Sequence, residues 1–366
     1  MAITILIAFF SIIALLIIHE FGHFIVAKRF GIEVKEFGVG LPPRLFGKKI
    51  GKTIYSLNLL PFGAFVKIPS VEGGGEEDKE NYQKLENIPV WQRALIILAG
   101  VVSFWLVGII LLSIVFSIGT FQAISDEEEG PFVNPPKVQI AAIAPDSPAE
   151  IAGIKPGDAI KQFQISNFKF QISKVKEVQE LTEEYKGEEV TLIIERGKEV
   201  FEVSLVPRVS PPEGEGAMGV ALVRTAEKSY PIFQAFIKGA ETTINLTQAI
   251  VVGLVEVLVS LIKGQGLPPG VQFMGPIGIG VLVAQAVQVG LSYFLQFIAI
   301  IAIYLAIFNL LPIPALDGGR LLFLGIEKIK GSPVNQKIEQ NITTGFFILF
   351  IALMILVTIK DVARLF

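Results

Sequence analysis

The sequence predicts a polytopic α-helical membrane protein with about four transmembrane helices, a membrane-associated β-hairpin region and an inserted α+β domain. Hydrophobic residues make up 52% of the chain and charged residues 18%, and the mean hydropathy is +0.61. The apolar residues gather in long segments, and a helix of about 20 such residues can cross a bilayer. Four segments predict the transmembrane helices: residues 3–27, 94–121, 293–311 and 344–359.

The remaining composition excludes several kinds of site and partner. The chain has no cysteine, so disulfides and thiolate metal sites are excluded, and a zinc site would need histidine and carboxylate ligands. The net charge of −3 gives no reason to expect a nucleic-acid partner. The amino-terminal segment lacks the basic start and small-residue cleavage site of a signal peptide, so we expect it to be a retained transmembrane helix.

Several shorter segments also carry structural information. Residues 34–40 and 53–68 are typical of strands punctuated by glycine and proline, and they predict a β-hairpin that dips back towards the membrane. We expect residues 72–80, with three consecutive glycines, to be a flexible, solvated loop. Residues 249–262 are apolar over only about 14 positions, which suits an interfacial helix rather than a full crossing. The chain is therefore expected to divide into segments 1–125, 136–208, 230–290 and 291–366.

Charge sets the expected orientation in the membrane. Basic residues are concentrated in the loop after the first span and in the loop between the last two spans, and by the positive-inside rule both loops are cytoplasmic. The long insertion begins with an acidic run, residues 126–129, and is expected outside together with both chain termini. The basic residues of the two loops are Lys28, Arg29, Lys35, Arg44, Lys48, Lys49 and Lys52, and then Arg320, Lys328, Lys330 and Lys337.

The insertion predicts a small α+β domain over residues 136–208. Its expected order is a strand at 138–143, a short helix capped by Ser147, a strand at 159–163, a helix at 175–185 and a final hairpin. This order, with the sequence Ala-Gly-Ile-Lys-Pro-Gly-Asp at 152–158, resembles a PDZ domain. An unrelated small β-rich domain is the alternative.

The two histidines of the chain, His19 and His23, both lie in the run His-Glu-Phe-Gly-His at the end of the first apolar segment. Residues four apart share one face of a helix, so the two imidazoles could bind one zinc ion, with Glu20 placed between them as a general base. Ordinary polar residues at a membrane interface are the alternative. Because ionisable groups at membrane depth usually have a function, we favour the zinc site.

Catalytic zinc usually has three protein ligands, so two histidines are one ligand short. The best candidate for the third is Asp317, in the run Asn309-Leu-Leu-Pro-Ile-Pro-Ala-Leu-Asp-Gly-Gly at the end of the third span. Its prolines should break the helix and free backbone groups near a pocket. An ordinary turn at a helix end would be the favoured interpretation of Asp-Gly alone. Because Asp317 is expected at the same depth in the membrane as the two histidines, we favour its role as a metal ligand.

These motifs together resemble the site-2 protease family of intramembrane zinc metalloproteases, in particular its bacterial regulator-of-sigma-E protease (RseP) type. The resemblance covers nearly the whole chain, including Phe-Gly-Val-Gly at 37–40, Pro-Phe-Gly-Ala-Phe-Val-Lys at 61–67, Gly-Pro-Ile at 275–277 and Glu-Lys-Ile-Lys-Gly at 327–331. It implies a multi-pass protein of the bacterial inner membrane. Its substrates would be single-span membrane proteins, such as trimmed anti-sigma factors or signal-peptide remnants.

The resemblance also implies roles for individual residues. His19, His23 and Asp317 would bind Zn²⁺, Glu20 would be the catalytic base, and Asn309 would bind substrate near the scissile carbonyl. The extracytoplasmic PDZ domain could bind a peptide C-terminus or exclude large ectodomains. The active site would lie nearer the cytoplasmic side.

This sequence departs from the family pattern at two points. RseP proteins carry two PDZ domains in tandem, whereas about 70 residues here leave room for one. The family often has asparagine at the position of Phe104, where we expect the change to affect a helix contact. The competing functions are a membrane-bound PDZ adaptor with a non-catalytic metal site, and a membrane zinc protease whose active site is soluble.

Overall fold

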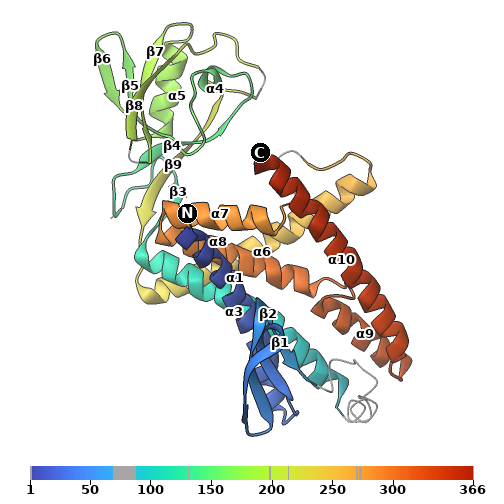
Figure 1. Ribbon diagram of the computed structural model, residues 1–366. Coiled ribbons are helices and arrows are strands. Elements are labelled where there is room, and N and C mark those ends of the chain that lie inside the picture. The colour runs from blue at the N-terminus through green and yellow to red at the C-terminus, as the bar shows by residue number, and fades with distance from the viewer. Residues whose placement is uncertain are drawn as a thin grey trace. The chain divides into compact units, whose positions relative to one another are not determined.

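The computed structural model describes residues 2–68, 88–130, 132–197, 199–212, 214–268, 271 and 274–365 (Figure 1). It divides into a helical unit, Met1–Val115 with Ile232–Phe366, and a second unit, Phe116–Pro231. The loop expected at residues 72–80 lies outside the described residues.

The four expected spans are all long helices of the structure. Each helix begins before the apolar segment that predicted it. The first and last helices also end after their segments, whereas the other two end slightly before theirs. The helices are α1 (Ala2–Arg29), α3 (Val90–Ile118), α8 (Leu291–Leu310) and α10 (Gln336–Leu365).

A fifth helix, α6 (Ile232–Ile262), is also long and apolar enough to cross a membrane, so the described residues contain five such helices rather than four. The sequence predicted only residues 249–262 as an apolar segment here, because the first half of α6 carries polar residues. Trp105 of the neighbouring α3 donates a hydrogen bond to the Thr247 hydroxyl at 3.2 Å. Thr243 donates to the carbonyl of Gly239 within α6 itself, at 2.8 Å. A side chain at Gly239 would overlap the Ser113 hydroxyl, so α3 and α6 approach closely.

The core of the helical unit lies where α1, α3, α8 and the short α7 (Pro276–Val289) meet. Small residues on α8 alternate with larger ones on the other helices, so the helices pack closely. A last short helix, α9 (Asp317–Lys330), follows α8. The buried core residues are Ala8, Leu15, Val101, Phe104, Val283, Ile298, Ala302 and Ala306.

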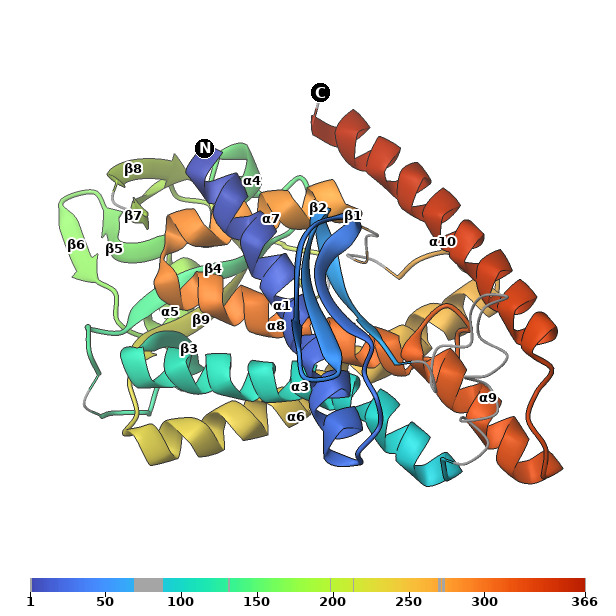
Figure 2. The ribbon, with the colours of Figure 1, turned by 60° about the horizontal axis from the view of Figure 1, so that its bottom comes forward.

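The expected β-hairpin is a curved sheet of two long strands, β1 (Glu36–Ile50) and β2 (Thr53–Lys67), which lies along α1 (Figure 2). Residues 36–39 pair with residues 54–57 on one side and with residues 64–67 on the other. Residues 44–50 pair with residues 53–58. Buried Glu36 accepts a hydrogen bond from Ser56 at 2.6 Å and pairs with Arg44 at 2.7 Å. Burial opposes ionisation of Glu36, but these two partners outweigh it and lower the pKa of its carboxyl.

The second unit contains the expected α+β domain, with its core between the sheet and α5. The Ser147 cap is confirmed, because its hydroxyl accepts a hydrogen bond from the Glu150 amide. The elements in chain order are β3 (Thr120–Ile124), β4 (Lys137–Ile143), α4 (Pro148–Ile151), β5 (Ala159–Ile165), β6 (Phe168–Gln171), α5 (Val175–Glu184), β7 (Val190–Arg196), β8 (Glu199–Leu205) and β9 (Val220–Lys228).

The sheet of this unit extends beyond the range 136–208 expected for the domain at both ends. The sheet order is β3-β9-β4-β5-β7-β8, with β6 paired to β5, and residues 220–225 of β9 pair with residues 137–143 of β4. The acidic run at 126–129 also belongs to this unit: Asp126 accepts hydrogen bonds from the amides of Val175 and Lys176 at the start of α5. Buried Arg224 holds the same loop by donating to the carbonyls of Ser125 and Glu128. These pairings join segments far apart in sequence, so local patterns did not reveal them.

Candidate metal centre

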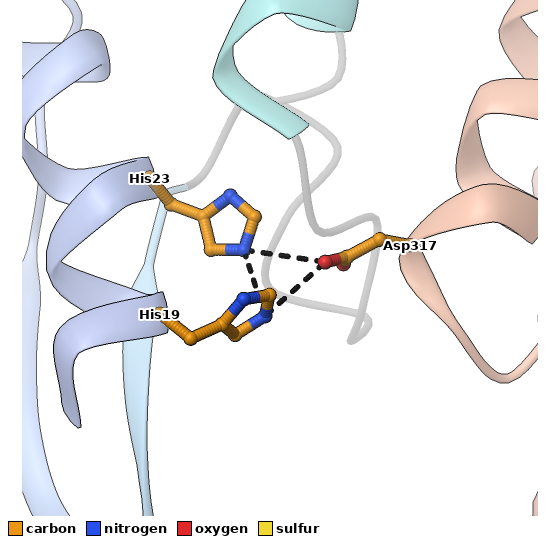
Figure 3. Close-up of side chains that lie close together, drawn as sticks. All are labelled: His19, His23 and Asp317. Carbon is orange, nitrogen blue, oxygen red and sulfur yellow. Dashed lines mark hydrogen bonds and ion pairs between the residues drawn. The ribbon is translucent and has the colours of Figure 1, made fainter. Parts of the chain in front are cut away.

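The two histidines lie one turn apart on α1 and face the same direction (Figure 3). Their side chains are buried within the helical unit, and their Nε2 atoms are 3.2 Å apart. The Nδ1 atom of His23 is 2.8 Å from the carbonyl oxygen of Ile96. Since a carbonyl can only accept, this Nδ1 carries the proton, and in the neutral ring the lone pair of Nε2 points towards His19.

Asp317 approaches these nitrogens from a different helix, as the third group in Figure 3. Its Oδ2 lies 3.2 Å from Nε2 of His19 and 3.4 Å from Nε2 of His23. Within the described part of the chain, these three residues form the one group of potential ligands close enough to hold a metal ion.

The triangle of donor atoms fits zinc. Tetrahedral zinc with bonds of about 2.0–2.1 Å separates neighbouring ligand atoms by about 3.3–3.4 Å, close to the three distances here. Oδ2 of Asp317 is buried and accepts no hydrogen bond from any described residue. A buried carboxylate oxygen facing nitrogen lone pairs would be costly by itself, whereas a shared cation stabilises all three atoms.

Local sequence explains how Asp317 reaches this position. We expected it to end the third span, but α8 ends at Leu310 and Asp317 is the first residue of α9. Prolines 312 and 314 prevent α8 from continuing. A side chain at Gly318 would overlap the carbonyl of Leu311, and one at Gly319 would overlap that of Ile313. The two glycines therefore let the start of α9 pack directly on the preceding turn and hold Asp317 there.

Helix α3 supplies a supporting face that sequence reasoning did not identify. Ile96, Gly100 and Phe104 are spaced four residues apart and so lie on one side of the helix. The Ile96 carbonyl accepts from His23, and a side chain at Gly100 would overlap Nε2 of the same histidine. The ring of Phe104, expected to affect a helix contact, stacks directly on His19 with centroids 4.6 Å apart. The spacing of the three residues was the available signal, but only the structure shows what they face.

The remaining predicted residues, Glu20 and Asn309, line a cavity of about 240 Å³ together with the three clustered residues. Glu20 is half-buried and is not part of the donor triangle. The Asn309 amide donates to the Leu305 carbonyl at 2.9 Å, within its own helix. The cavity also has residues that the sequence did not single out for this site, among them Val66, Ile68, Arg320 and Thr343.

Comparison with known proteins identifies the family. The family model for peptidase family M50 matches residues 7–353. The chain belongs to peptidase family M50. It is 33% identical to the CPE1693 protein of Clostridium perfringens, classed by name with zinc metalloproteases, over 98% of each chain. It is also 27% identical to the regulator of sigma-W protease RasP of Bacillus subtilis, over the full length of both, and 28% identical to the zinc metalloprotease RasP of Oceanobacillus iheyensis, over 99% of this chain and 100% of the relative.

Family membership fixes the class of reaction. This M50 peptidase is a zinc-dependent metalloendopeptidase of the membrane, and its function is intramembrane proteolysis. The several long apolar helices agree with a multi-pass membrane protein. A role as an adaptor without activity is therefore not supported.

Two further buried ionic groups stabilise the helices around the site of this M50 peptidase. Arg93, near the start of α3, donates two hydrogen bonds to Glu327 of α9, one of them at 3.0 Å. Asp361, near the end of α10, accepts the amides of Gly275 and Gly278 at 2.8 Å each and so caps α7. Asp361 is therefore a structural residue and a poor neutral control for substitutions at Asp317.

Proposed function

We propose that this protease cleaves peptide bonds in or beside the transmembrane segments of single-span membrane proteins, with His19, His23 and Asp317 as its zinc ligands. The donor triangle carries the proposal, because three buried ligand atoms are separated by 3.2–3.4 Å. When bound, zinc would polarise the scissile carbonyl and lower the pKa of a water molecule.

In this proposal Glu20 is the general base. It borders the cavity beside the triangle but is not a ligand, so its carboxylate can take a proton from water and later give it to the leaving amine. Asn309, at the wall of the same cavity, would bind the substrate backbone near the scissile carbonyl.

We further propose that the edge of the β1–β2 sheet holds the substrate in an extended form. A helical substrate must unwind before cleavage, because its carbonyls are hydrogen-bonded within the helix. Val66 and Ile68, at the end of β2, line the cavity. Residues 64–67 pair with 36–39 on one side and have no strand partner on the other side among the residues described. This free edge lies where an added strand would pass the donor triangle.

The α+β unit is proposed to be a single PDZ domain that binds a peptide C-terminus. A cavity of about 230 Å³ lies between α5 and the start of β9, with Val178, Met218 and Leu222 among its lining residues. On the side away from β4, strand β3 pairs with β9 only from Arg224 onwards, so among the described residues the start of β9 has no strand partner on that side, beside this cavity. A short extended peptide with an apolar last residue would fit there.

The proposed substrates are trimmed anti-sigma factors and signal-peptide remnants in the bacterial inner membrane. One relative is named as a regulator of sigma-W protease, which points to membrane-bound regulators of this kind. The test is mass spectrometry of membranes from cells with the active enzyme and with Glu20→Gln. We expect single-span stubs to accumulate with the variant. An unchanged stub population would contradict the proposed substrate class.

We propose that the PDZ unit lies outside the cytoplasm and that α6 begins and ends on the outer side. At its start, Tyr230 bonds to the Phe116 carbonyl near the end of α3, and after it Gly275 bonds to Asp361 near the end of α10. Both of those helix ends are outside in the proposed topology. Such an arrangement makes α6 an interfacial or partly inserted helix despite its length.

The absence of cysteine allows a clean test of this topology. Single cysteines replacing exposed Lys169 and Gln265 should react with an impermeant maleimide in intact cells, whereas one replacing exposed Ser332 should react only after lysis. Labelling of Ser332→Cys in intact cells, with protection of Lys169→Cys, would mean that the protein has the opposite orientation in the membrane. Protection of Gln265→Cys alone would mean that α6 crosses the membrane.

A further inference from the structure

The two histidines of the donor triangle are held by different interactions. His23 is fixed by the hydrogen bond of its Nδ1 to the Ile96 carbonyl. Nδ1 of His19 is also buried, but no described residue offers it a hydrogen bond. A histidine that binds a metal usually donates its second ring nitrogen to an acceptor, which fixes both the ring orientation and the tautomer. His19 therefore needs another source of orientation.

The ring of Phe104 lies against one face of the His19 imidazole and can supply this orienting contact. Its side chain is fully buried, and its plane is inclined by only 12° to the imidazole of His19, at a centroid distance of 4.6 Å. On α3, a side chain at Gly100 would lie 2.8 Å from Cε1 of His19, so the helix backbone closes another side of the ring. The imidazole of His23 packs edge-on against His19 at 4.6 Å and 83°. The His19 ring is thus confined by packing on several sides.

We propose that Phe104 is a positioning residue for zinc binding, because its stacked ring orients His19 where a hydrogen bond to Nδ1 is missing. The stacking keeps Nε2 directed at Oδ2 of Asp317 and Nε2 of His23. Because no described residue accepts a hydrogen bond from Nδ1, His19 gains none of the added basicity that such a bond gives to a ligand. This inference rests on the proposed zinc ligands.

The test is the zinc affinity of purified full-length protein, measured by competition with a chromogenic chelator. Phe104→Leu keeps an apolar side chain but removes the stacked ring, and should weaken zinc binding about threefold to tenfold, since aromatic pairs contribute in this range. Phe116→Leu makes the same change at another buried position of α3 and should leave zinc affinity unchanged. Substitution of Co²⁺ should give a visible spectrum that is altered in Phe104→Leu and unaltered in Phe116→Leu.

A third variant, His19→Ala, separates this inference from the proposed site. Loss of zinc binding in His19→Ala, together with unchanged affinity and cobalt spectrum in a folded Phe104→Leu, would overturn the positioning role alone. Full zinc binding in His19→Ala would overturn the ligand assignment itself. If Phe104→Leu does not fold, Phe104→Met takes its place, because methionine is apolar and close in size to phenylalanine but also removes the ring: weakened zinc affinity or an altered cobalt spectrum would support the positioning role, and unchanged values would contradict it.

Discussion

Replacing Glu20 with glutamine should reduce proteolysis of a model transmembrane substrate by roughly 10²–10⁴-fold, the usual loss when a general base is removed. The amide has nearly the same shape as the carboxylate but cannot take up a proton. Because Glu20 lies outside the donor triangle, the variant should still bind one zinc ion per chain. Cleavage is measured with purified enzyme in detergent or lipid, and bound metal by elemental analysis.

Two results would count against this role of Glu20. Cleavage at a rate comparable to that of the unmodified enzyme would mean that another group takes the proton. Loss of zinc from the variant would mean that Glu20 acts as a ligand or holds one in place.

Replacing Asp317 with asparagine should abolish activity and strongly weaken zinc binding. The substitution removes the negative charge that faces both histidine nitrogens, at 3.2 Å and 3.4 Å. Loss of an outer-shell partner typically costs roughly 10–100-fold in metal affinity, and loss of a direct ligand should cost more. Zinc affinity of the purified protein by chelator competition is the measurement.

The matched control for this substitution is Asp146→Asn. Asp146 lies in an exposed turn of the second unit with a φ of 53°, a conformation that asparagine accepts well, and it should change neither zinc binding nor activity. Asp361→Asn is unsuitable because that carboxylate caps α7. Unchanged zinc affinity in Asp317→Asn would show that the third ligand lies elsewhere.

Much of the helical unit could be predicted from the sequence, because an apolar segment of membrane length has few alternatives to a helix. The least certain segment was 230–290, where polar residues on α6 lowered the local hydropathy. One of them, Thr247, accepts a hydrogen bond from Trp105 of α3. In the second unit, local strand and cap signals predicted β4, β5 and the Ser147 cap. They missed β3 and β9, whose pairing joins residues far apart in the sequence, such as Thr120 with Lys228.

The residue types in the sequence were enough to predict the chemistry of the candidate site. With two histidines and no cysteine, zinc ligands could come only from His19, His23 and a carboxylate, and Asp317 was the carboxylate at matching depth. Only the folded structure shows what surrounds these three residues: the Ile96 carbonyl and Phe104 ring on α3, and the sheet edge at Val66. The ability to bind a metal is a property of the residue type, whereas the contacts that orient each side chain depend on which helix faces pack together. That packing is set by close approaches such as Gly22 against the Ala99 carbonyl, which no local pattern encodes.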